Sequence, residues 1–390
     1  MALAGDNNPP ASARGRGELH IPSLDGLRAL SFGLVFTSHA GLHAVPGGFG
    51  VTVFFFLSGF LITTLMRIEY ERTQKVGFGR FYLRRALRIL PPFYLVLLSA
   101  TVLAAVGVVA GPLRWQAVMA QALHYANYWV VFHTGSTGFA HGTGVYWSLA
   151  VEEHFYLLFP LGYSLLRRAG ASARRQATVF LTLCGLMLAW RCLLFFAFGA
   201  SEDRTGMASD TRFDSILFGC LLAVYGNPVL DPPRIGDRAW KWGLLPLGLL
   251  GLLASFAFRG DAFRQTFRYT LQGICLVPVF VCAMRFPRSW AGRVLNLRPL
   301  AFLGVLSYSL YLIHLVVLDA VLFRVGSRLG APLASLMALA ITVVLAWGVY
   351  EIIEKPCARL RRRLASAPSR PPAVAQPAVP VTVDSRTQLF

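Results

Sequence analysis

The stretch Asp25-Gly-Leu-Arg-Ala-Leu-Ser-Phe-Gly-Leu-Val-Phe-Thr-Ser-His39 opens the first strongly apolar segment of the chain. It carries Arg28 near its start and His39 eleven residues later. Eleven residues are almost three helical turns, so on a helix the two side chains share one face about 16 Å apart. Charged groups inside membrane helices usually mark functional sites. Taken singly, each residue is better explained structurally, Arg28 as a snorkelling side chain at the interface and His39 as a hydrogen-bonded core histidine, and the rest of the chain changes that interpretation.

The composition is typical of a polytopic membrane protein, with 55% hydrophobic and 14% charged residues among 390. This length accommodates about ten spans of ~20 residues with short connections. The formal charge of +19 falls in the loops, which argues against nucleic-acid binding. We therefore predict an all-α polytopic fold with about ten transmembrane helices. The apolar segments are 27–45, 48–66, 91–110, 146–166, 177–199, 213–226, 243–258, 267–284, 300–323 and 333–353.

Lysines and arginines concentrate in alternate loops, which by the positive-inside rule predicts that both termini are cytoplasmic. Residues 1–20 are predicted to be a disordered tail, 21–358 the membrane domain, and 359–390 a basic and then Pro/Ala-rich flexible cytoplasmic tail. The amphipathic stretch 115–132 is predicted to be re-entrant, a partial span, or interfacial. The six cysteines have no zinc or disulfide spacing, so no metal site is expected.

An arginine cluster precedes the third apolar segment, on the predicted cytoplasmic side. A helix would place Arg84, Arg85 and Arg88 on one side, because they are three and four residues apart. Pro91 and Pro92 predict a break before the span. Guanidinium forks suit phosphate groups, although such clusters also contact anionic lipid headgroups.

Three further constellations interrupt apolar segments. Glu152 and Glu153 follow Trp147 at the start of the fourth segment, and a buried carboxylate there needs a partner such as Arg28 or His39. Asp210, Arg212 and Asp214 lie at the outer mouth of the sixth segment, where they either line an entrance or cap the helix. In the ninth segment, Tyr311 and His314 are three residues apart.

Together these motifs resemble the acyltransferase type 3 family of integral membrane acyltransferases. The resemblance covers roughly residues 21–357, and each motif is weak alone whereas their order is specific. The chain lacks the hydrolase-like domain that some members carry after the last span, so it resembles the stand-alone type. The motifs are Arg28 with His39, Gly50–Ile62, Arg84–Pro91, Trp147–Tyr156, Asp210–Asp214, Tyr308–His314 and Glu354–Pro356.

The resemblance implies transfer of an acyl group, usually acetyl from acetyl-CoA, to a carbohydrate hydroxyl in the bacterial cytoplasmic membrane. No tightly bound cofactor is implied. The acceptor is a cell-surface polysaccharide, a lipopolysaccharide O-antigen or another lipid-linked glycan, or alternatively a macrolide. A transporter is the rival from another class, but the two halves of the chain show no repeat.

Acyl transfer needs a held donor, a deprotonated hydroxyl and a stabilised oxyanion. His39 is the candidate general base, with Glu152 orienting its imidazole. Arg28 is expected either to stabilise negative charge on the oxyanion or to hold the CoA end of the donor. The chemistry is either direct attack or passage through an acyl-enzyme. Arg84, Arg85 and Arg88 are the candidate donor-phosphate ligands. Residues expected to contact substrate are Trp147, Asp210, Arg212, Asp214, Tyr311 and His314.

Overall fold

Helices make up the architecture throughout the part of the chain that the structure, a computed structural model, describes: residues 21–109, 112–133 and 135–366. No strand occurs in these ranges, which confirms the all-α prediction. The predicted tails at 1–20 and beyond residue 366 lie outside the described residues. The long helices are α1 Pro22–His39, α2 Gly47–Thr73, α3 Phe78–Ala105, α6 Trp147–Arg168, α7 Ala173–Phe196, α9 Ser209–Val224, α11 Leu245–Ala257, α13 Phe267–Arg285, α16 Ser307–Leu329 and α17 Ala331–Val349.

Shorter elements connect these helices. They are α4 Trp115–Ala122, α5 Ala126–Phe132, η2 Gly144–Tyr146, α8 Glu202–Met207, α10 Asp237–Ala239, η3 Trp240–Leu244, α12 Asp261–Gln265, α14 Trp290–Leu295, α15 Arg298–Val305, η4 Tyr350–Glu354 and α18 Lys355–Ser366. The amphipathic stretch 115–132 thus forms α4 and α5, and α5 packs against α6.

Seven helical stretches in the described ranges are long and apolar enough to cross a membrane, so this is a multi-pass membrane protein. The helices α1, α6 and α9 are not among them, since α1 and α6 carry several polar residues and α9 has only 16 residues. These three helices carry most of the candidate site residues. The count of ten spans and the cytoplasmic termini stay predictions.

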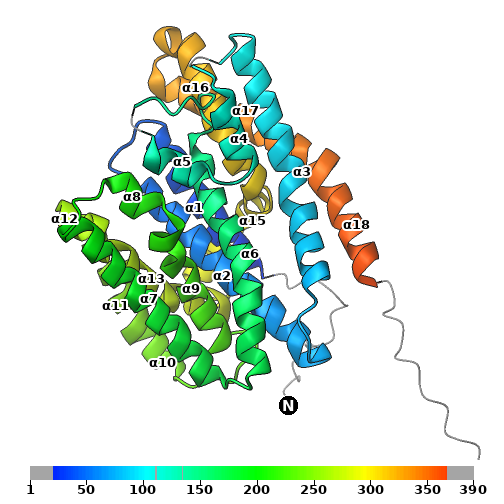
Figure 1. Cartoon of the computed structure of the whole chain (residues 1–390), viewed down its shortest axis with the longest axis vertical. Helices are drawn as coiled ribbons and strands as arrows, with labels where there is room; N and C mark the ends of the chain where they lie inside the picture. Colours follow the sequence, from blue (N-terminus) through cyan, green and yellow to red (C-terminus); the bar gives the residue numbers. More distant parts are fainter. Residues whose placement is uncertain (1–20, 110–111, 134, 367–390) are drawn as a thin grey trace, which may run out of the picture.

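The core of the bundle is the contact between α2 and α9. Of the apolar window of α2, 72% is buried, against 22% for α7. Glycines bring the two backbones together: a Cβ on Gly59 would lie 2.0 Å from the Ile216 carbonyl oxygen, and one on Gly219 would lie 2.0 Å from that of Phe56. In Figure 1, α3 and α18 form one flank of the bundle and α7, α11 and α13 form the other.

The break predicted at Pro91 and Pro92 is wrong, because α3 runs without interruption from Phe78 to Ala105. Membrane helices tolerate proline when neighbouring side chains satisfy the freed backbone groups. The carbonyls that lose a donor to Pro91 and Pro92 are those of Leu87 and Arg88. Next to them, the Tyr308 hydroxyl of α16 donates to the Ile89 carbonyl at 2.9 Å and joins α3 to α16 at this point. The arginine cluster therefore belongs to the same rigid helix as the third span.

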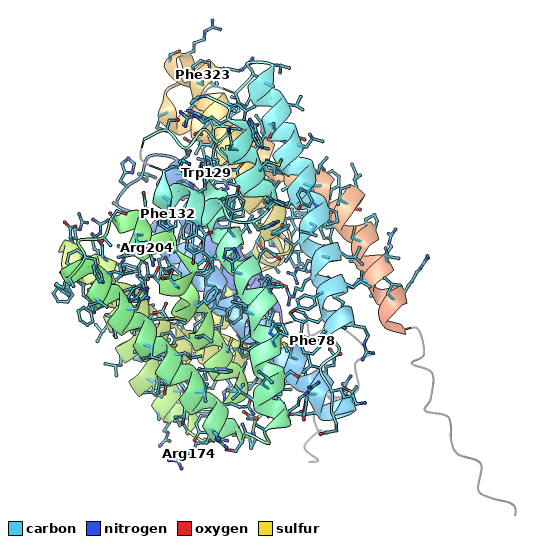
Figure 2. The ribbon with its side chains drawn as sticks, in the orientation of Figure 1. Phe78, Trp129, Phe132, Arg174, Arg204 and Phe323 are labelled. Atoms are coloured by element: carbon cyan, nitrogen blue, oxygen red, sulfur yellow. The ribbon has the colours of Figure 1, made fainter. Side chains whose placement is uncertain are left out.

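The C-terminal segment also differs from the prediction. The basic run 359–363, expected to begin a flexible tail, is helical in α18 and packs against α3. The π turn η4 joins α17 to α18, so the helical path extends from Ala331 to Ser366. Figure 2 shows Phe323 and Arg174 at opposite ends of the bundle.

Candidate active site

His39 is the last residue of α1, and its ring meets that of His314 on α16. The His39 Nδ1 and His314 Nε2 atoms are 3.0 Å apart. His39 is exposed, whereas His314 is fully buried beside Phe32, whose ring meets it edge-on at 5.7 Å. The structure thus places the solvent-exposed imidazole of His39 in hydrogen-bond contact with the buried imidazole of His314. We call His39 and His314 the histidine pair.

Aromatic residues surround the histidine pair and join α16 to the start of α6. The Tyr311 hydroxyl lies 2.8 Å from Ser148 Oγ and donates to the Val145 carbonyl at 3.2 Å. The Tyr311 ring also packs against His314, with their centroids 5.6 Å apart. Trp147, next to Ser148, meets Phe55 of α2 edge-to-face. The predicted residues His39, Tyr311 and His314 therefore belong to one neighbourhood, and Trp147 is joined to it through the adjacent Ser148.

Arg28 lies near the start of α1, about three turns before His39, and forms an ion pair with Asp25. Its Nη1 atom is 2.6 Å from Asp25 Oδ1, one turn earlier, and its side chain is 18% exposed. Its second charged neighbour is Arg88 of α3, which interacts with it electrostatically. Arg28 and His39 share the face that their spacing predicts, but no contact joins them among the described residues.

Glu152 does not contact His39, contrary to the orienting contact expected from the sequence. Its Oε1 atom accepts a hydrogen bond from Ser58 Oγ of α2 at 2.5 Å. It also lies within electrostatic reach of Arg85 and Arg88. The side chain that hydrogen-bonds to the His39 ring is His314. We call Arg28, Arg85, Arg88 and Glu152 the arginine–glutamate cluster.

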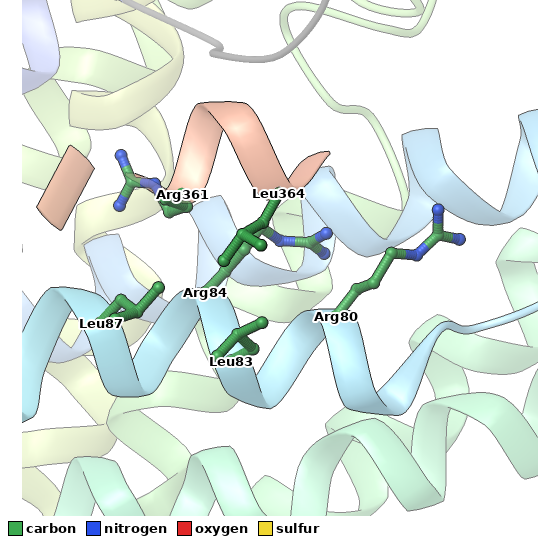
Figure 3. A pocket seen from close by; sticks show the side chains of 6 residues that line it. All are labelled: Arg80, Leu83, Arg84, Leu87, Arg361 and Leu364. Atoms are coloured by element: carbon green, nitrogen blue, oxygen red, sulfur yellow. The ribbon is translucent and has the colours of Figure 1, made fainter. Parts of the chain in front are cut away.

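The three arginines of α3 are not grouped on one side as their spacing suggested. The Arg85 guanidinium lies over the Tyr156 ring, 5.2 Å from its centroid, and faces the arginine–glutamate cluster. Arg84 instead points to Glu69 of α2, with the charged atoms 2.8 Å apart. Arg84 also lines a separate pocket between α3 and α18 (Figure 3), whose lining residues are Arg80, Leu83, Arg84, Leu87, Arg361 and Leu364.

The Asp210, Arg212 and Asp214 side chains have three different environments. Asp210 accepts from Arg204 at 2.6 Å and from the Trp190 indole at 2.7 Å near one end of the bundle. Arg212 is buried, with its guanidinium 3.9 Å from the centroid of the Tyr269 ring. These contacts hold the start of α9 against its neighbours.

Asp214 forms a fully buried ion pair with Arg191 of α7, a residue that sequence reasoning missed. The Arg191 Nη2 and Asp214 Oδ2 atoms are 2.7 Å apart, and both side chains are 0% exposed. A lone arginine within the apolar segment 177–199 was the available signal, because a buried cation needs a partner. The Asp214 carboxylate therefore binds Arg191 and joins α9 to α7.

A second missed ion pair lies in the connection after α9. Asp231 accepts from Arg67 Nη2 at 2.6 Å and from the backbone N–H of Asn227 at 2.9 Å. Partial burial raises the pKa of Asp231, but the hydrogen bonds from Arg67 and Asn227 outweigh it, so the net pKa is lowered. The pair ties the end of α2 to the loop that follows α9.

Comparison with known proteins identifies the family to which the chain belongs. The family described as an acyltransferase domain matches residues 21–351, which contain every candidate site residue. The chain belongs to this acyltransferase family. No solved structure matches the chain.

Three relatives show where the likeness lies. The chain is 30% identical over 353 residues to YrhL of Bacillus subtilis, covering 86% of this chain and 55% of that protein. It is 29% identical over 308 residues to the peptidoglycan O-acetyltransferase OatA of Listeria monocytogenes, covering 76% and 49%. It is 30% identical over 314 residues to the O-acetyltransferase OatA of Staphylococcus aureus, covering 76% and 50%. The chain spans about half the length of these relatives.

Proposed function

We propose that the protein is an O-acetyltransferase that moves an acetyl group from acetyl-CoA to a hydroxyl of a cell-surface glycan. The histidine pair carries this proposal, because an exposed imidazole backed by a buried one is arranged to accept a proton. Family membership and the names of the OatA relatives support it. We place the protein in the bacterial cytoplasmic membrane.

The general base in this proposal is His39. Its exposed ring accepts the proton of the acceptor hydroxyl while the oxygen attacks the thioester carbonyl. The tetrahedral oxyanion then collapses, the C–S bond breaks, and the proton passes to the thiolate of CoA. An acyl-enzyme would be indicated instead if, after acid quenching, the labelled acetyl group were found on the protein and not on the free product.

The donor contacts are assigned to the side of the bundle away from His39. Acyl-CoA carries phosphates, and Arg88 lies within electrostatic reach of both Arg28 and Arg85. The carboxylates near these arginines include Glu152 and Glu153. Planar guanidinium forks bind phosphate oxygens in pairs. Helix geometry separates Arg28 from His39 by about 16 Å, a span that an extended thiol arm of the donor can bridge.

The acceptor proposed is a peptidoglycan-type glycan, because peptidoglycan is the substrate that the name of the Listeria relative gives. Trp147, whose ring meets Phe55 edge-to-face, is the aromatic platform proposed for a sugar ring. Asp214 is not assigned to the acceptor, because Arg191 occupies its carboxylate. A macrolide and a lipopolysaccharide O-antigen are the alternatives that the assay compares.

The test uses the full chain in detergent or proteoliposomes with labelled acetyl-CoA and separate peptidoglycan, O-antigen and macrolide acceptors. We expect label transfer to glycan hydroxyls, and His39→Ala should reduce it by about 10²–10⁴-fold, the usual contribution of a general base. His133→Ala, an exposed histidine at the end of α5, is the matched control. Absence of transfer to any acceptor by well-folded protein would favour the transporter, and full activity in His39→Ala would remove the base.

A further inference from the structure

The hydrogen bonds of His314 fix the positions of its ring protons. His314 Nδ1 lies 2.8 Å from the backbone carbonyl oxygen of Tyr311, one turn earlier on α16. A carbonyl oxygen only accepts hydrogen bonds, so Nδ1 of His314 must carry the proton. In the neutral ring the other nitrogen, Nε2, then holds a lone pair.

The tautomer of His39 follows from that of His314. Because His314 Nε2 is an acceptor, the 3.0 Å contact requires His39 Nδ1 to donate its proton to it. The two ring planes are 18° apart, and the ring centroids are separated by 5.2 Å. The 3.0 Å between the two nitrogens accounts for most of this centroid separation, as it does when the rings meet edge to edge. The two nitrogens therefore face each other. Neutral His39 is left with its lone pair on Nε2.

The surroundings of His314 leave no substitute for this acceptor. His314 is 0% exposed, and the rings of Phe32, Phe36 and Tyr311 pack around it. Water is thus excluded from the side of His39 that His314 contacts. Both His314 nitrogens are already engaged, so this residue has no polar atom left for the substrate contact that the sequence suggested.

We infer that His314 is a positioning residue, which with the Tyr311 carbonyl holds His39 in the tautomer that presents the Nε2 lone pair to the acceptor hydroxyl. This inference rests on the proposed function. In the step, the acceptor O–H bond breaks, an N–H bond forms at His39 Nε2, and the oxygen bonds to the acyl carbon. His39 becomes an imidazolium, and its Nδ1–H keeps its hydrogen bond to His314 Nε2. His314 gains no proton, and the proton on Nε2 leaves with the CoA thiolate.

The arrangement replaces the carboxylate of a hydrolase triad with a neutral acceptor. In a triad the third residue sets the tautomer and orientation of the base and stabilises its charged form. The backbone carbonyl of Tyr311 and the His314 ring supply the same three effects here without a buried negative charge. A neutral acceptor also avoids the cost of burying an unpaired carboxylate among the aromatic rings.

The experiment compares two substitutions of His314 in the full chain. His314→Gln can keep an acceptor oxygen near the position of Nε2, whereas His314→Phe fills the space without one. We expect His314→Phe to lower kcat by about 10²-fold or more, toward the range of a lost general base, with KM for acetyl-CoA nearly unchanged. His314→Gln should recover most of kcat. His124→Phe, a partly buried histidine between α4 and α5, controls for the loss of a histidine.

A spectroscopic readout separates positioning from a packing role. Nitrogen NMR of histidine-labelled protein distinguishes the two neutral tautomers, and comparison with His39→Ala identifies the His39 signals. The parent should show His39 with its proton on Nδ1, and His314→Phe should shift it toward Nε2. An unchanged His39 tautomer in His314→Phe, or equal activity of the Phe variant and the parent, would overturn the inference.

The outcomes distinguish this inference from the proposed function. If the parent transfers acetyl and His39→Ala does not, the base assignment holds and the His314 variants test positioning alone. If His39→Ala is fully active, the base assignment falls, and the inference falls with it. Equal losses in His314→Gln and His314→Phe with an unshifted tautomer would make His314 a packing residue.

Discussion

Replacing Arg191 with leucine tests whether its buried ion pair holds the bundle together. Arg191 donates to Asp214 Oδ2 at 2.7 Å, to the Thr211 carbonyl at 2.5 Å, to the Thr266 carbonyl at 3.0 Å and to Thr270 Oγ1 at 2.5 Å. Leucine fills much of the volume but supplies none of these donors. The change therefore removes the counter-charge of a buried carboxylate and one donor from each of two backbone carbonyls.

The expected magnitude follows from those contacts. Removing one partner of a buried ion pair typically costs about 3–5 kcal/mol of unfolding free energy. Each of the two carbonyls that lose the Arg191 donor adds up to about 1–3 kcal/mol. Arg191→Leu should therefore lose about 5 kcal/mol, close to the total stability of a small domain. Asp214→Asn keeps a neutral acceptor for Arg191 and should lose less, roughly 3 kcal/mol.

The assay is equilibrium unfolding in mixed micelles, followed by tryptophan fluorescence and helical circular dichroism. Arg204→Leu is the matched control, because its pair with Asp210 is equally short at 2.6 Å but has side chains that are 19% and 38% exposed. Such a pair should contribute at most about 1 kcal/mol. The double variant Arg191→Leu with Asp214→Asn should lose less than the sum of the single losses, since neither charge is then left unpaired.

Two results would refute this reasoning. Arg191→Leu that unfolds no earlier than Arg204→Leu would show that the pair contributes little to stability. If Asp214→Asn kept parental stability but lost acetyl transfer, Asp214 would have a role in substrate binding and not in stability.

Three further predictions concern donor binding, packing and pH. Arg85→Ala and Arg88→Ala should each weaken acetyl-CoA binding by about 1.5–3 kcal/mol in calorimetry, with lysine restoring only part because it lacks the planar fork; unchanged affinity in both would remove the phosphate role. Gly219→Val should abolish correct insertion, since its Cβ would lie 2.0 Å from a carbonyl of α2, and a normal yield of protein with parental thermal stability would contradict that close contact. The lowered pKa of Asp231 means that its pair with Arg67 stabilises the fold above about pH 4 and loses that contribution as pH falls toward the folded-state pKa. Asp231→Asn should therefore flatten the acid side of a plot of thermal stability against pH, and an unaltered plot would argue against this linkage.

Hydrophobic periodicity predicted the helices well, because lipid and core both select apolar residues. Each of the ten predicted segments overlaps a long helix, and the stretch 115–132 forms two short ones. The error at Pro91 and Pro92 arose because proline breaks helices in water by leaving carbonyls unsatisfied. In the bundle α3 packs against α16, whose Tyr308 hydroxyl donates to the Ile89 carbonyl beside the prolines, and a contact between residues more than 200 apart is not revealed by local sequence.

The site was predicted at the level of residues but not of pairs. His39 and His314 were both identified, yet the sequence favoured Glu152 as the partner of His39. Glu152 and His314 were both plausible partners of His39. Helix periodicity shows which face of its own helix a side chain occupies, but it does not show which neighbouring helix that face contacts. The same limit hid the pairing of Asp214 with Arg191, which depends on the packing of α7 against α9.

The π turn η4 has a consequence for how the C-terminal helix could diverge among related sequences. A π turn holds one residue more than an α turn, so everything after it is rotated by about 100° relative to an uninterrupted α-helix. Leu364 faces α3 in that rotated frame. Deleting one residue from Tyr350–Glu354 would restore regular winding and leave Leu364 facing α3, because the lost residue and the lost π turn rotate α18 by about 100° in opposite senses. A related sequence can therefore lose the extra residue of this π turn and still turn the same side of α18 toward α3, with α18 unchanged in length.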